Sequence, residues 1–292
     1  MKIAILSRRS SIYSTDRLKQ SALEHGHYVR VIDHMHCNLI MEQGKPRILY
    51  LGNLLDKFDA VIPRIGASVT YYGSAVIRQF EMMNVFSAVS SSALLVSRDK
   101  LRSLQQLSKA GIGLPKTVFT NFSKDANEVV KMAGGPPLII KLLEGTQGLG
   151  VILAEKQTAA ISVIEAFYGL KAKIIIQEFI EESKGTDIRA FVVGGEIVAA
   201  MKRTAQGDEF RSNFHRGGTC KLEVLTEKEK QTAIDAANTL GLGIAGVDML
   251  RSERGPLIIE VNSSPGLEGI ENVTQEDIAG KIIEYVEQNV GK

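Results

Sequence analysis

An apolar run that contains a lysine, Leu138-Ile139-Ile140-Lys141-Leu142, is followed by the glycine-rich loop Glu144-Gly145-Thr146-Gln147-Gly148-Leu149-Gly150-Val151. A lysine in a β-type run cannot bury its ammonium without an anion, so Lys141 requires a phosphate or carboxylate partner. The three glycines of the loop tolerate positive φ, which lets its N–H groups fold over phosphate oxygens. A hairpin turn beside an edge-strand lysine is the alternative, but the position of Lys141 directly before the loop favours phosphate binding.

Strand-like and helix-like segments alternate before this stretch, which favours a parallel sheet. The turn Ser7-Arg8-Arg9-Ser10-Ser11 lacks the G-x-G-x-x-G spacing of dinucleotide-binding proteins, and no G-x-x-x-x-G-K-[ST] motif of P-loop proteins occurs in the chain. The expected strands are Lys2–Ser7, Tyr28–Asp33 and Phe58–Pro63, and the expected helices are Thr15–His25 and Tyr71–Met83.

The middle and last parts of the chain continue this alternation. A helix is expected from Ser97 to Ala110, and Gly111, Gly113 and Pro115 after it indicate a domain boundary. A hairpin is expected where Gly194-Gly195 separates two apolar runs. The other expected strands are Lys116–Phe119, Leu138–Leu143, Lys173–Ile180, Ile188–Val193, Ile197–Met201 and two around Asp248 and Ile258; the other expected helices are Lys124–Ala133, Thr158–Gly169, Glu227–Leu240 and one at the C-terminal end.

Oxygen-bearing side chains interrupt two apolar runs near the end of the chain. Gly246-Val247-Asp248 contains one, and Ile258-Ile259-Glu260-Val261-Asn262 contains two. Residues two apart on a strand share a face, so Glu260 and Asn262 should point the same way. Two carboxylates and an amide oxygen suit a hard cation such as Mg²⁺; strand-end residues with local hydrogen bonds are the alternative.

Composition excludes several classes of protein. The 292 residues are 44% hydrophobic and 23% charged, which excludes a disordered or collagenous chain, and the net charge of +2 does not favour direct nucleic-acid binding. That total is the sum of +8 for residues 1–220 and −6 for residues 221–292. Two cysteines imply no disulfide framework, and no apolar run reaches the length of a membrane span, so we expect a cytoplasmic protein with no membrane partner.

Other candidate side chains have plain structural explanations beside the functional ones. His34-Met35-His36-Cys37 could bind a metal but lacks a second ligand pair, so a loop with a half-buried thiol is favoured. His215 could contact substrate or hold a structural hydrogen bond. Lys202, Arg203 and Arg216 could hold substrate carboxylates or lie on a solvated hairpin face. Cys220 is most simply a small apolar filler.

Six motifs in order resemble those of the ATP-grasp ligases: the strand lysine with its glycine loop, Gln177-Glu178-Phe179-Ile180, Gly185-Thr186-Asp187-Ile188-Arg189, Arg211-Ser212-Asn213, Gly246-Val247-Asp248 and Glu260-Val261-Asn262-Ser263-Ser264-Pro265-Gly266. Three stretches are similar, more narrowly, to the RimK-type ligases, which add glutamate to the C-terminus of small-subunit ribosomal protein S-six: Ser97-Arg98-Asp99-Lys100-Leu101-Arg102-Ser103, Gly145-Thr146-Gln147-Gly148 and Pro265-Gly266-Leu267-Glu268-Gly269-Ile270-Glu271. The resemblance covers the whole chain.

The resemblance implies a role for each matched residue. Lys100 and Lys141 would contact ATP phosphates under the loop that contains Gly145, Gln147 and Gly148, and Asp187 would be an acid of the nucleotide site. The catalytic pair would be Arg211 and Asn213, which with Ser212 lie near the triphosphate. Adenine would lie against Gln177, Glu178, Phe179 and Ile180, and the metal ligands would be Asp248, Glu260 and Asn262.

The resemblance also implies a fold and a reaction. The expected class is α/β, an ATP-grasp fold with an N-terminal open parallel-sheet (pre-ATP-grasp) domain at 1–95, a central lid domain at 96–180 and a C-terminal α+β domain at 181–292. ATP and two Mg²⁺ ions, or Mn²⁺, would activate a carboxylate as an acyl phosphate, which an amine converts to an amide. No protein nucleophile is required, which agrees with the absence of a convincing Ser-His-Asp or Cys-His arrangement.

The expected substrates are L-glutamate and the C-terminal tail of a ribosomal protein, with repeated addition giving a poly-glutamate tail, and the expected assembly is a homo-oligomer. Three alternatives stay open. A ligase of the same fold could join an amino acid to a small molecule or carrier protein, or make free poly-α-glutamate. The chain could be a nucleotide-binding regulator without chemistry. It could be a kinase, although no H-R-D or D-F-G order occurs.

Overall fold

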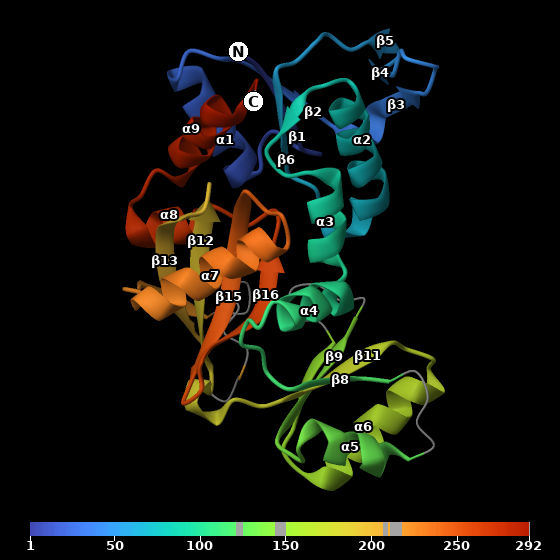
Figure 1. The fold of residues 1–292 in the computed structure, drawn as a ribbon, viewed down its shortest axis with the longest axis vertical. Helices are drawn as coiled ribbons and strands as arrows, with labels where there is room; N and C mark the ends of the chain where they lie inside the picture. The colour runs from blue at the N-terminus through green and yellow to red at the C-terminus, as the bar shows by residue number, and fades with distance from the viewer. Residues whose placement is uncertain (121–124, 144–149, 207–209, 211–217, 292) are drawn as a thin grey trace.

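A computed structural model of the chain describes residues 1–120, 125–143, 150–206, 210 and 218–291. The described residues form three sheet-containing parts along the long axis of the molecule (Figure 1). The N-terminal part and the central part lie at the two ends of this axis. The last third of the chain fills the space between them and then returns to the N-terminal part, so both termini lie at the same end of the molecule.

The N-terminal part is the parallel sheet that the sequence predicts. Its strand order is β2 (Tyr28–Ile32), β1 (Lys2–Leu6), β6 (Ala60–Pro63) and β7 (Phe86–Ser87), and every pairing is parallel. Helices α1 (Tyr13–Glu24) and α2 (Thr70–Met82) connect these strands. The prediction missed a small antiparallel sheet of β3 (Cys37–Ile40), β4 (Arg47–Tyr50) and β5 (Asn53–Leu54), and the short 3-10 helices η1 (His34–His36) and η2 (Ala67–Val69).

The single helix expected from Ser97 to Ala110 is wrong. The structure has α3 (Ser91–Arg98) and α4 (Lys100–Lys109), which meet at Asp99. The Asp99 carboxylate accepts a hydrogen bond from the Arg102 backbone N–H at 3.0 Å and so caps the start of α4, while the Ser90 hydroxyl caps α3. In a continuous helix the Arg102 N–H would donate to a backbone carbonyl one turn earlier. Here it donates to the Asp99 side chain at the N-cap, which explains the break.

The central part is an antiparallel sheet with two helices on one face (Figure 1). Its strand order is β10 (Val151–Ala154), β9 (Leu138–Leu142), β11 (Ile174–Glu178) and β8 (Thr117–Phe119). The helices α5 (Ala126–Ala133) and α6 (Gln157–Gly169) pack against it. A hydrophobic cluster drawn entirely from residues 126–176 fills the space between sheet and helices.

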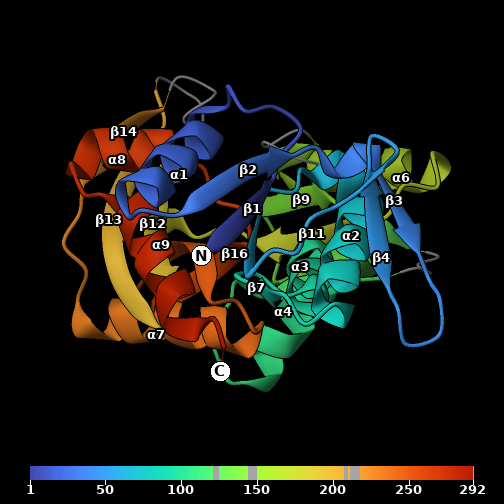
Figure 2. The same ribbon diagram turned by 90° about the horizontal axis from the view of Figure 1, so that it is seen from above.

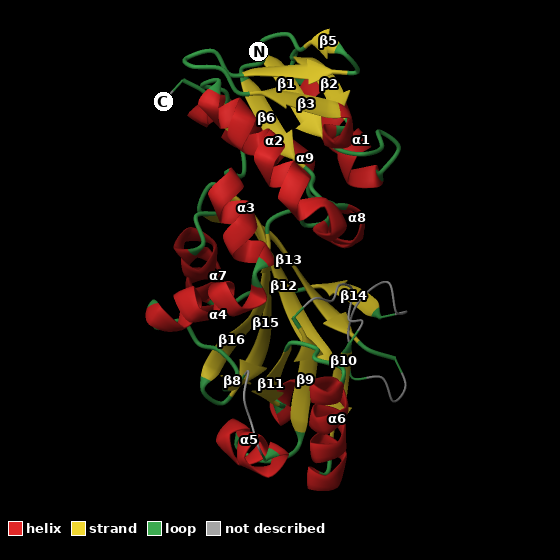
Figure 3. Ribbon diagram, turned by 90° about the vertical axis from the view of Figure 1, so that its right-hand side faces the viewer, coloured by secondary structure: helices red, strands yellow, loops and turns green. Residues whose placement is uncertain are grey.

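The C-terminal part is built on a larger antiparallel sheet, which Figure 3 shows between the other two parts. Its strand order is β14 (Thr219–Leu222), β13 (Glu196–Thr204), β12 (Thr186–Val193), β15 (Ile244–Ser252) and β16 (Gly255–Asn262). The hairpin predicted at Gly194-Gly195 joins β12 to β13 and is confirmed, whereas β14 was not predicted. The 3-10 helix η3 (Glu181–Ser183) precedes the sheet, and α7 (Glu227–Thr239), α8 (Glu268–Thr274) and α9 (Ile278–Asn289) accompany it.

A second, larger hydrophobic cluster unites the N-terminal and C-terminal parts. It includes Ile3 and Ile5 of the parallel sheet together with Phe191 and Val247 of the C-terminal sheet, all fully buried. The central part therefore has its own core, and the rest of the chain shares another. Domain boundaries at 95 and 180 stay a prediction.

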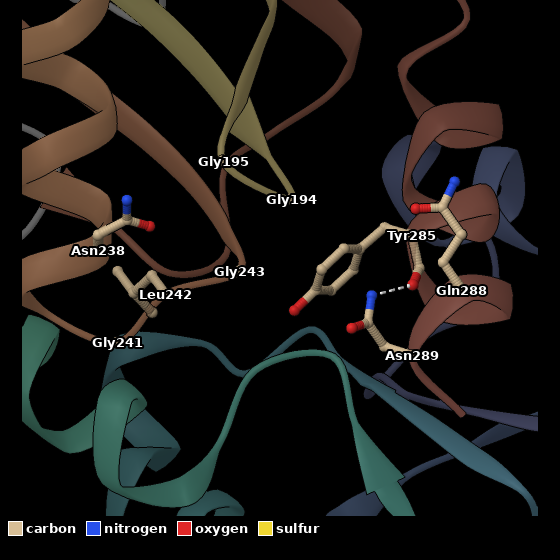
Figure 4. Close-up of a pocket in the computed structure, with 9 residues that line it drawn as sticks. All are labelled: Gly194, Gly195, Asn238, Gly241, Leu242, Gly243, Tyr285, Gln288 and Asn289. Atoms are coloured by element: carbon tan, nitrogen blue, oxygen red, sulfur yellow. Dashed lines mark hydrogen bonds between the residues drawn. The ribbon is translucent and has the colours of Figure 1, made fainter. Parts of the chain in front are cut away.

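Helix α9 ends the described chain and packs beside α1 (Figures 1 and 2). Its Tyr285 ring lies against the turns that contain Gly194 and Gly243 (Figure 4). A Cβ atom on Gly243 would lie 2.0 Å from the Tyr285 hydroxyl oxygen, so only glycine allows this packing. No helix within the described residues is both long and apolar enough to cross a membrane.

Candidate active site

Strand register places six polar side chains on one face of the C-terminal sheet. Directly opposed residues on neighbouring strands share a face, as do residues two apart on one strand. The opposed pairs are Asp187 with Arg203, Arg189 with Asp248, Asp248 with Glu260, and Gly246 with Asn262. The residues on this face are Asp187, Arg189, Arg203, Asp248, Glu260 and Asn262. The predicted shared face of Glu260 and Asn262 agrees with this register, and Asp248 joins them.

Two arginines bind the carboxylates on this face. Arg189 donates to both oxygens of Asp248 at 2.7 Å, and Arg203 reaches Asp248 at 2.8 Å. Arg203 also donates to both oxygens of Asp187, at 2.5 and 2.7 Å. Burial alone would raise the pKa of Asp248, but the charges of Arg189 and Arg203 outweigh it and lower that pKa to about 2. Asp248 is therefore an anion throughout the neutral range.

Arg203 does not have either role that the sequence suggested for it. It is neither a free holder of substrate carboxylates nor part of a solvated hairpin face, because its side chain is buried and both its partners belong to the protein. Burial lowers its pKa, but the two aspartates outweigh burial and raise it above its ordinary value. Arg189 was missed as the second partner, although its position two residues after Asp187 indicates that the two share a face.

We expect Arg203→Met to destabilise the fold by about 3 kcal/mol, because it leaves two buried carboxylates facing each other with one fewer cation. Urea unfolding followed by circular dichroism measures this loss. The matched control is Lys202→Met on the opposite face of the same strand, where we expect a change of less than about 0.5 kcal/mol. Equal effects of the two substitutions would contradict the pairing.

Two lysines from different parts of the chain act electrostatically on Glu260. Lys141 lies on β9, and Lys100 is the first residue of α4, where its Nζ donates to the Leu142 carbonyl oxygen at 3.1 Å. Burial lowers the pKa of Lys141 to about 8; the Glu260 carboxylate partly offsets this, and the Lys100 charge adds to it. Burial also lowers the pKa of Lys100, again partly offset by Glu260. The structure thus brings together three residues that the sequence assigned to one site.

Two arginines that the sequence analysis gave no role extend this group of cations. Arg64 donates to the Pro265 carbonyl oxygen at 2.7 Å, and Arg98 donates to the Ile65 carbonyl oxygen at 2.7 Å. Burial lowers the pKa of Arg64 to about 10, with a further contribution from the Arg98 charge. Burial lowers the pKa of Arg98 as well, and Glu260 opposes the shift.

Three of these cations act on the same carboxylate of a described residue. Glu260 acts on Arg98, Lys100 and Lys141, while the buried Arg98 Nε has no hydrogen-bond partner in the described part of the chain. Partly desolvated cations that act on one another and on a shared carboxylate favour the binding of an anion. In the sequence, the stretch Ser97-Arg98-Asp99-Lys100 contains two of these cations, Arg98 and Lys100, and could have indicated that Arg98 belongs to the site.

The segment predicted to border adenine comprises the last two residues of β11 and the two residues after it. Gln177 is buried and its amide donates to Thr117 Oγ1 at 2.7 Å, while Glu178 accepts from the Lys116 N–H at 2.6 Å and pairs with Arg254. The N–H groups of Glu178 and Phe179 donate to the carbonyls of Lys116 and Pro137. Ile180 is buried, and its N–H donates to no residue that the structure describes. That N–H is the one backbone donor of Glu178 to Ile180 left for a ligand.

The predicted metal ligands present oxygen atoms on adjacent strands. Asp248 is buried between its arginines, Glu260 is exposed, and the Asn262 side-chain oxygen accepts from the Ser264 N–H at 2.9 Å. Buried hydroxyl oxygens of Ser263 and Ser264 beside them have no hydrogen-bond partner among the described residues. Hard cations prefer oxygen ligands, so this donor set fits Mg²⁺. Because Asp248 already accepts from two arginines, Glu260 is the carboxylate with more freedom to bind a cation.

Several predicted residues lie outside the described part of the chain: Gly145, Gln147, Gly148, Arg211, Ser212, Asn213, His215 and Arg216. Within it, His34 and Cys37 are buried and His36 is exposed, and these side chains form no cluster able to hold a metal. The Cys37 thiol is more buried than predicted, and burial raises its pKa to about 12. Cys220 is half-buried on β14, and both cysteines are free.

The hollow of about 530 Å³ in Figure 4 contains none of the predicted site residues. Gly194, Gly195, Gly241, Gly243 and Tyr285 contribute to its lining, with neutral amides of α7 and α9 beside them. A site for charged phosphates and carboxylates needs cations, and the lining of this hollow includes no lysine or arginine.

Comparison with known proteins covers the chain from end to end. Residues 1–94 match the RimK PreATP-grasp domain, and residues 97–286 match the RimK-like ATP-grasp domain. A probable alpha-L-glutamate ligase of Cellvibrio japonicus is 60% identical over 289 residues, which is 99% of this chain and 96% of that protein. One of Vibrio cholerae is 59% identical over the same shares of the two chains.

Solved structures share the fold at low sequence identity. The ATP-grasp ligase PsnB complexed with a minimal precursor superposes with a TM-score of 0.77 at 18% identity, over 98% of each chain. A RimK domain protein of Sphaerobacter thermophilus gives 0.69 at 20% identity, over 98% of this chain and 100% of its own. These likenesses confirm the predicted fold class.

Proposed function

Because the chain belongs to the RimK-like ATP-grasp family, whose members are ligases that form C–N bonds with ATP, we propose that it adds L-glutamate to the C-terminus of small-subunit ribosomal protein S-six. The relatives that span the whole chain are named as probable alpha-L-glutamate ligases, which supports glutamate as the amine substrate. Repeated addition would give a poly-glutamate tail, and we place the enzyme in the cytoplasm as a homo-oligomer.

The observation that carries this proposal is the group of cations around Glu260. A carboxylate and ATP are both anions, so a site that joins them must hold them against mutual repulsion. Lys100 and Lys141 would contact the phosphates of ATP, and the burial that lowers the pKa of each lysine supports an anionic partner for both. Arg64 and Arg98, which belong to the same group and are held by backbone carbonyls, would hold the acceptor carboxylate.

The reaction then needs two displacements. An oxygen of the acceptor carboxylate attacks the γ-phosphorus of ATP, and ADP leaves with the electrons of the broken P–O bond. The glutamate nitrogen attacks the acyl carbon, phosphate leaves, and loss of a proton from nitrogen gives the amide. The lysines and arginines hold the oxygens that carry charge in both steps.

Asp248, Glu260 and Asn262 would hold the divalent cations, for which we propose two Mg²⁺ ions, with Mn²⁺ as a substitute. Such cations neutralise charge on the transferred phosphoryl group. The Ile180 N–H would donate to adenine. Asp187 would act through Arg203, which it holds in place beside Asp248.

The affinity for ATP should fall above pH 8. Phosphate binding needs the protonated Lys141, whose pKa is lowered to about 8, so at higher pH binding must first protonate the lysine. The dissociation constant should then rise by up to about tenfold per pH unit. Fluorescent nucleotide binding between pH 6.5 and 9.5 measures it. Lys141→Arg keeps its charge over this range and should weaken the dependence, leaving only the part that Lys100 contributes; the same dependence in both proteins would contradict the role of Lys141.

The substrate assignment is tested by supplying each of the twenty amino acids with ATP, Mg²⁺ and the purified ribosomal protein. We expect ADP release with glutamate alone. Growth of free glutamate chains would indicate poly-α-glutamate synthesis, and turnover only with a small molecule or carrier protein would indicate a different acceptor. A phosphorylated product of unchanged chain length would indicate a kinase. Nucleotide binding without any ADP would indicate a regulator.

A further inference from the structure

Two histidines and a glutamate converge on elements that contribute no residue to the site described above. These elements are the turn after α1 and the helix α9, and α1 and α9 pack together (Figures 1 and 2). His25 and His27 flank Gly26 in the turn between α1 and β2, and Glu287 lies near the end of α9. Glu287 Oε1 is 3.2 Å from His25 Nδ1 and 2.7 Å from His27 Nε2. One potential ligand atom from each residue lies within 4.8 Å of the other two.

The fold holds this geometry from both sides. Gly26 takes a φ of +76°, which reverses the chain, and the N–H groups of His25 and His27 donate to the carbonyls of Ser21 and Ala22 at 3.0 Å. The other ring nitrogen of His27, Nδ1, lies 3.5 Å from the Met1 amine, so Nε2 faces Glu287. Because the Met1 ammonium donates to Nδ1, His27 Nε2 carries the ring proton toward Glu287, and a metal ion that binds at Nε2 would displace that proton.

The donor set selects a class of ligand. Two imidazole nitrogens and one carboxylate oxygen suit Zn²⁺, Co²⁺ or Ni²⁺, whereas Mg²⁺ prefers oxygen alone. The side chains of His25, His27 and Glu287 are 29%, 11% and 34% exposed, which lets an ion reach them and leaves a coordination position for water. We propose that His25, His27 and Glu287 form a transition-metal site that joins the α1–β2 turn to α9.

Binding there would connect residues more than 250 positions apart in the chain. Because the ligands come from two separate elements, the bound ion would stabilise the docking of α9 on the N-terminal part. None of the three residues belongs to the proposed active site. The inference therefore does not depend on the proposed function.

An ion pair between protonated histidine and Glu287 would give the same distances without a metal. Titration with Co²⁺ distinguishes a metal site from such an ion pair. The probe is Co²⁺ added to the full chain without Mg²⁺, followed by the visible absorption of the ion and by calorimetry. We expect saturable binding of one Co²⁺ ion per chain, and we expect this binding to require the side chains of His25, His27 and Glu287. His25→Asn, His27→Asn and Glu287→Gln should each weaken its binding by at least about tenfold.

Two controls make the result specific. His36→Asn removes an exposed histidine that lies 3.6 Å from Asp33 Oδ2 outside the cluster, and it should leave the Co²⁺ affinity unchanged. Glu260→Gln removes a proposed Mg²⁺ ligand and should also leave this affinity unchanged. Circular dichroism in EDTA checks that each variant is folded. Absence of Co²⁺ binding, binding that the cluster variants retain, or binding that only Glu260→Gln removes would overturn the proposal.

Discussion

Glu260→Gln should lower kcat/KM for ATP by about 10³-fold, because it removes the negative charge that would hold a divalent cation against the transferred phosphoryl group. Glu260 is the exposed carboxylate on the polar face of the C-terminal sheet. It is also the carboxylate that acts electrostatically on Arg98, Lys100 and Lys141. ADP release measured at increasing Mg²⁺ should also show a weaker apparent affinity for the ion.

The matched control for this loss is Glu276→Gln, which removes a carboxylate from an exposed position in the same part of the chain. It should change kcat/KM by less than about twofold, since surface substitutions away from a site have small effects. Wild-type Mg²⁺ dependence and rate in Glu260→Gln would show that Glu260 is not a metal ligand.

Lys141→Met should lower kcat/KM for ATP by about 10²-fold while leaving the protein at least as stable as the wild type. We expect the rate to fall because the variant lacks the cation that we propose to contact the phosphates. Stability does not fall, because burial lowers the pKa of Lys141 below its ordinary value. The folded state thus disfavours the ammonium at neutral pH, a cost that fades as pH rises from about 8 toward 10.5.

Kinetics of ADP release and thermal unfolding at pH 7 measure the two effects on one preparation. Lys131→Met, an exposed lysine on α5 in the same part of the molecule, should change neither. A Lys141→Met variant that keeps full activity but melts at a lower temperature would assign the lysine a structural role only. A substitution that lowers activity without lowering stability is expected at a residue whose side chain serves function at a cost to stability.

The parts of the site that follow from local pattern could be predicted from the sequence. Alternation along one strand indicated that Glu260 and Asn262 share a face, and the lysine within an apolar run identified Lys141. Both signals depend only on neighbours in the chain. The parallel N-terminal sheet also followed from the alternation of strands and helices.

Pairing between distant segments could not be predicted in this way. Arg203 lies beside Asp187 and Asp248 because β12 stands between β13 and β15, and strand order depends on the packing of the whole domain. Arg64 joins the site through the Pro265 carbonyl, 201 positions away. The helix break at Asp99 depends on a local feature, the Asp99 carboxylate that caps α4, whereas the helical spacing of Leu101, Leu104 and Leu107 does not indicate where the helix begins.

The glutamate ligase proposal is tested most directly by the intact mass of the acceptor. Purified small-subunit ribosomal protein S-six is incubated with the enzyme, ATP, Mg²⁺ and L-glutamate, and its mass is followed over time beside ADP release. The account predicts a ladder that rises in steps of one glutamyl residue, at a rate that Glu260→Gln and Lys141→Met reduce. An acceptor of unchanged mass while ADP accumulates in the presence of glutamate would contradict it.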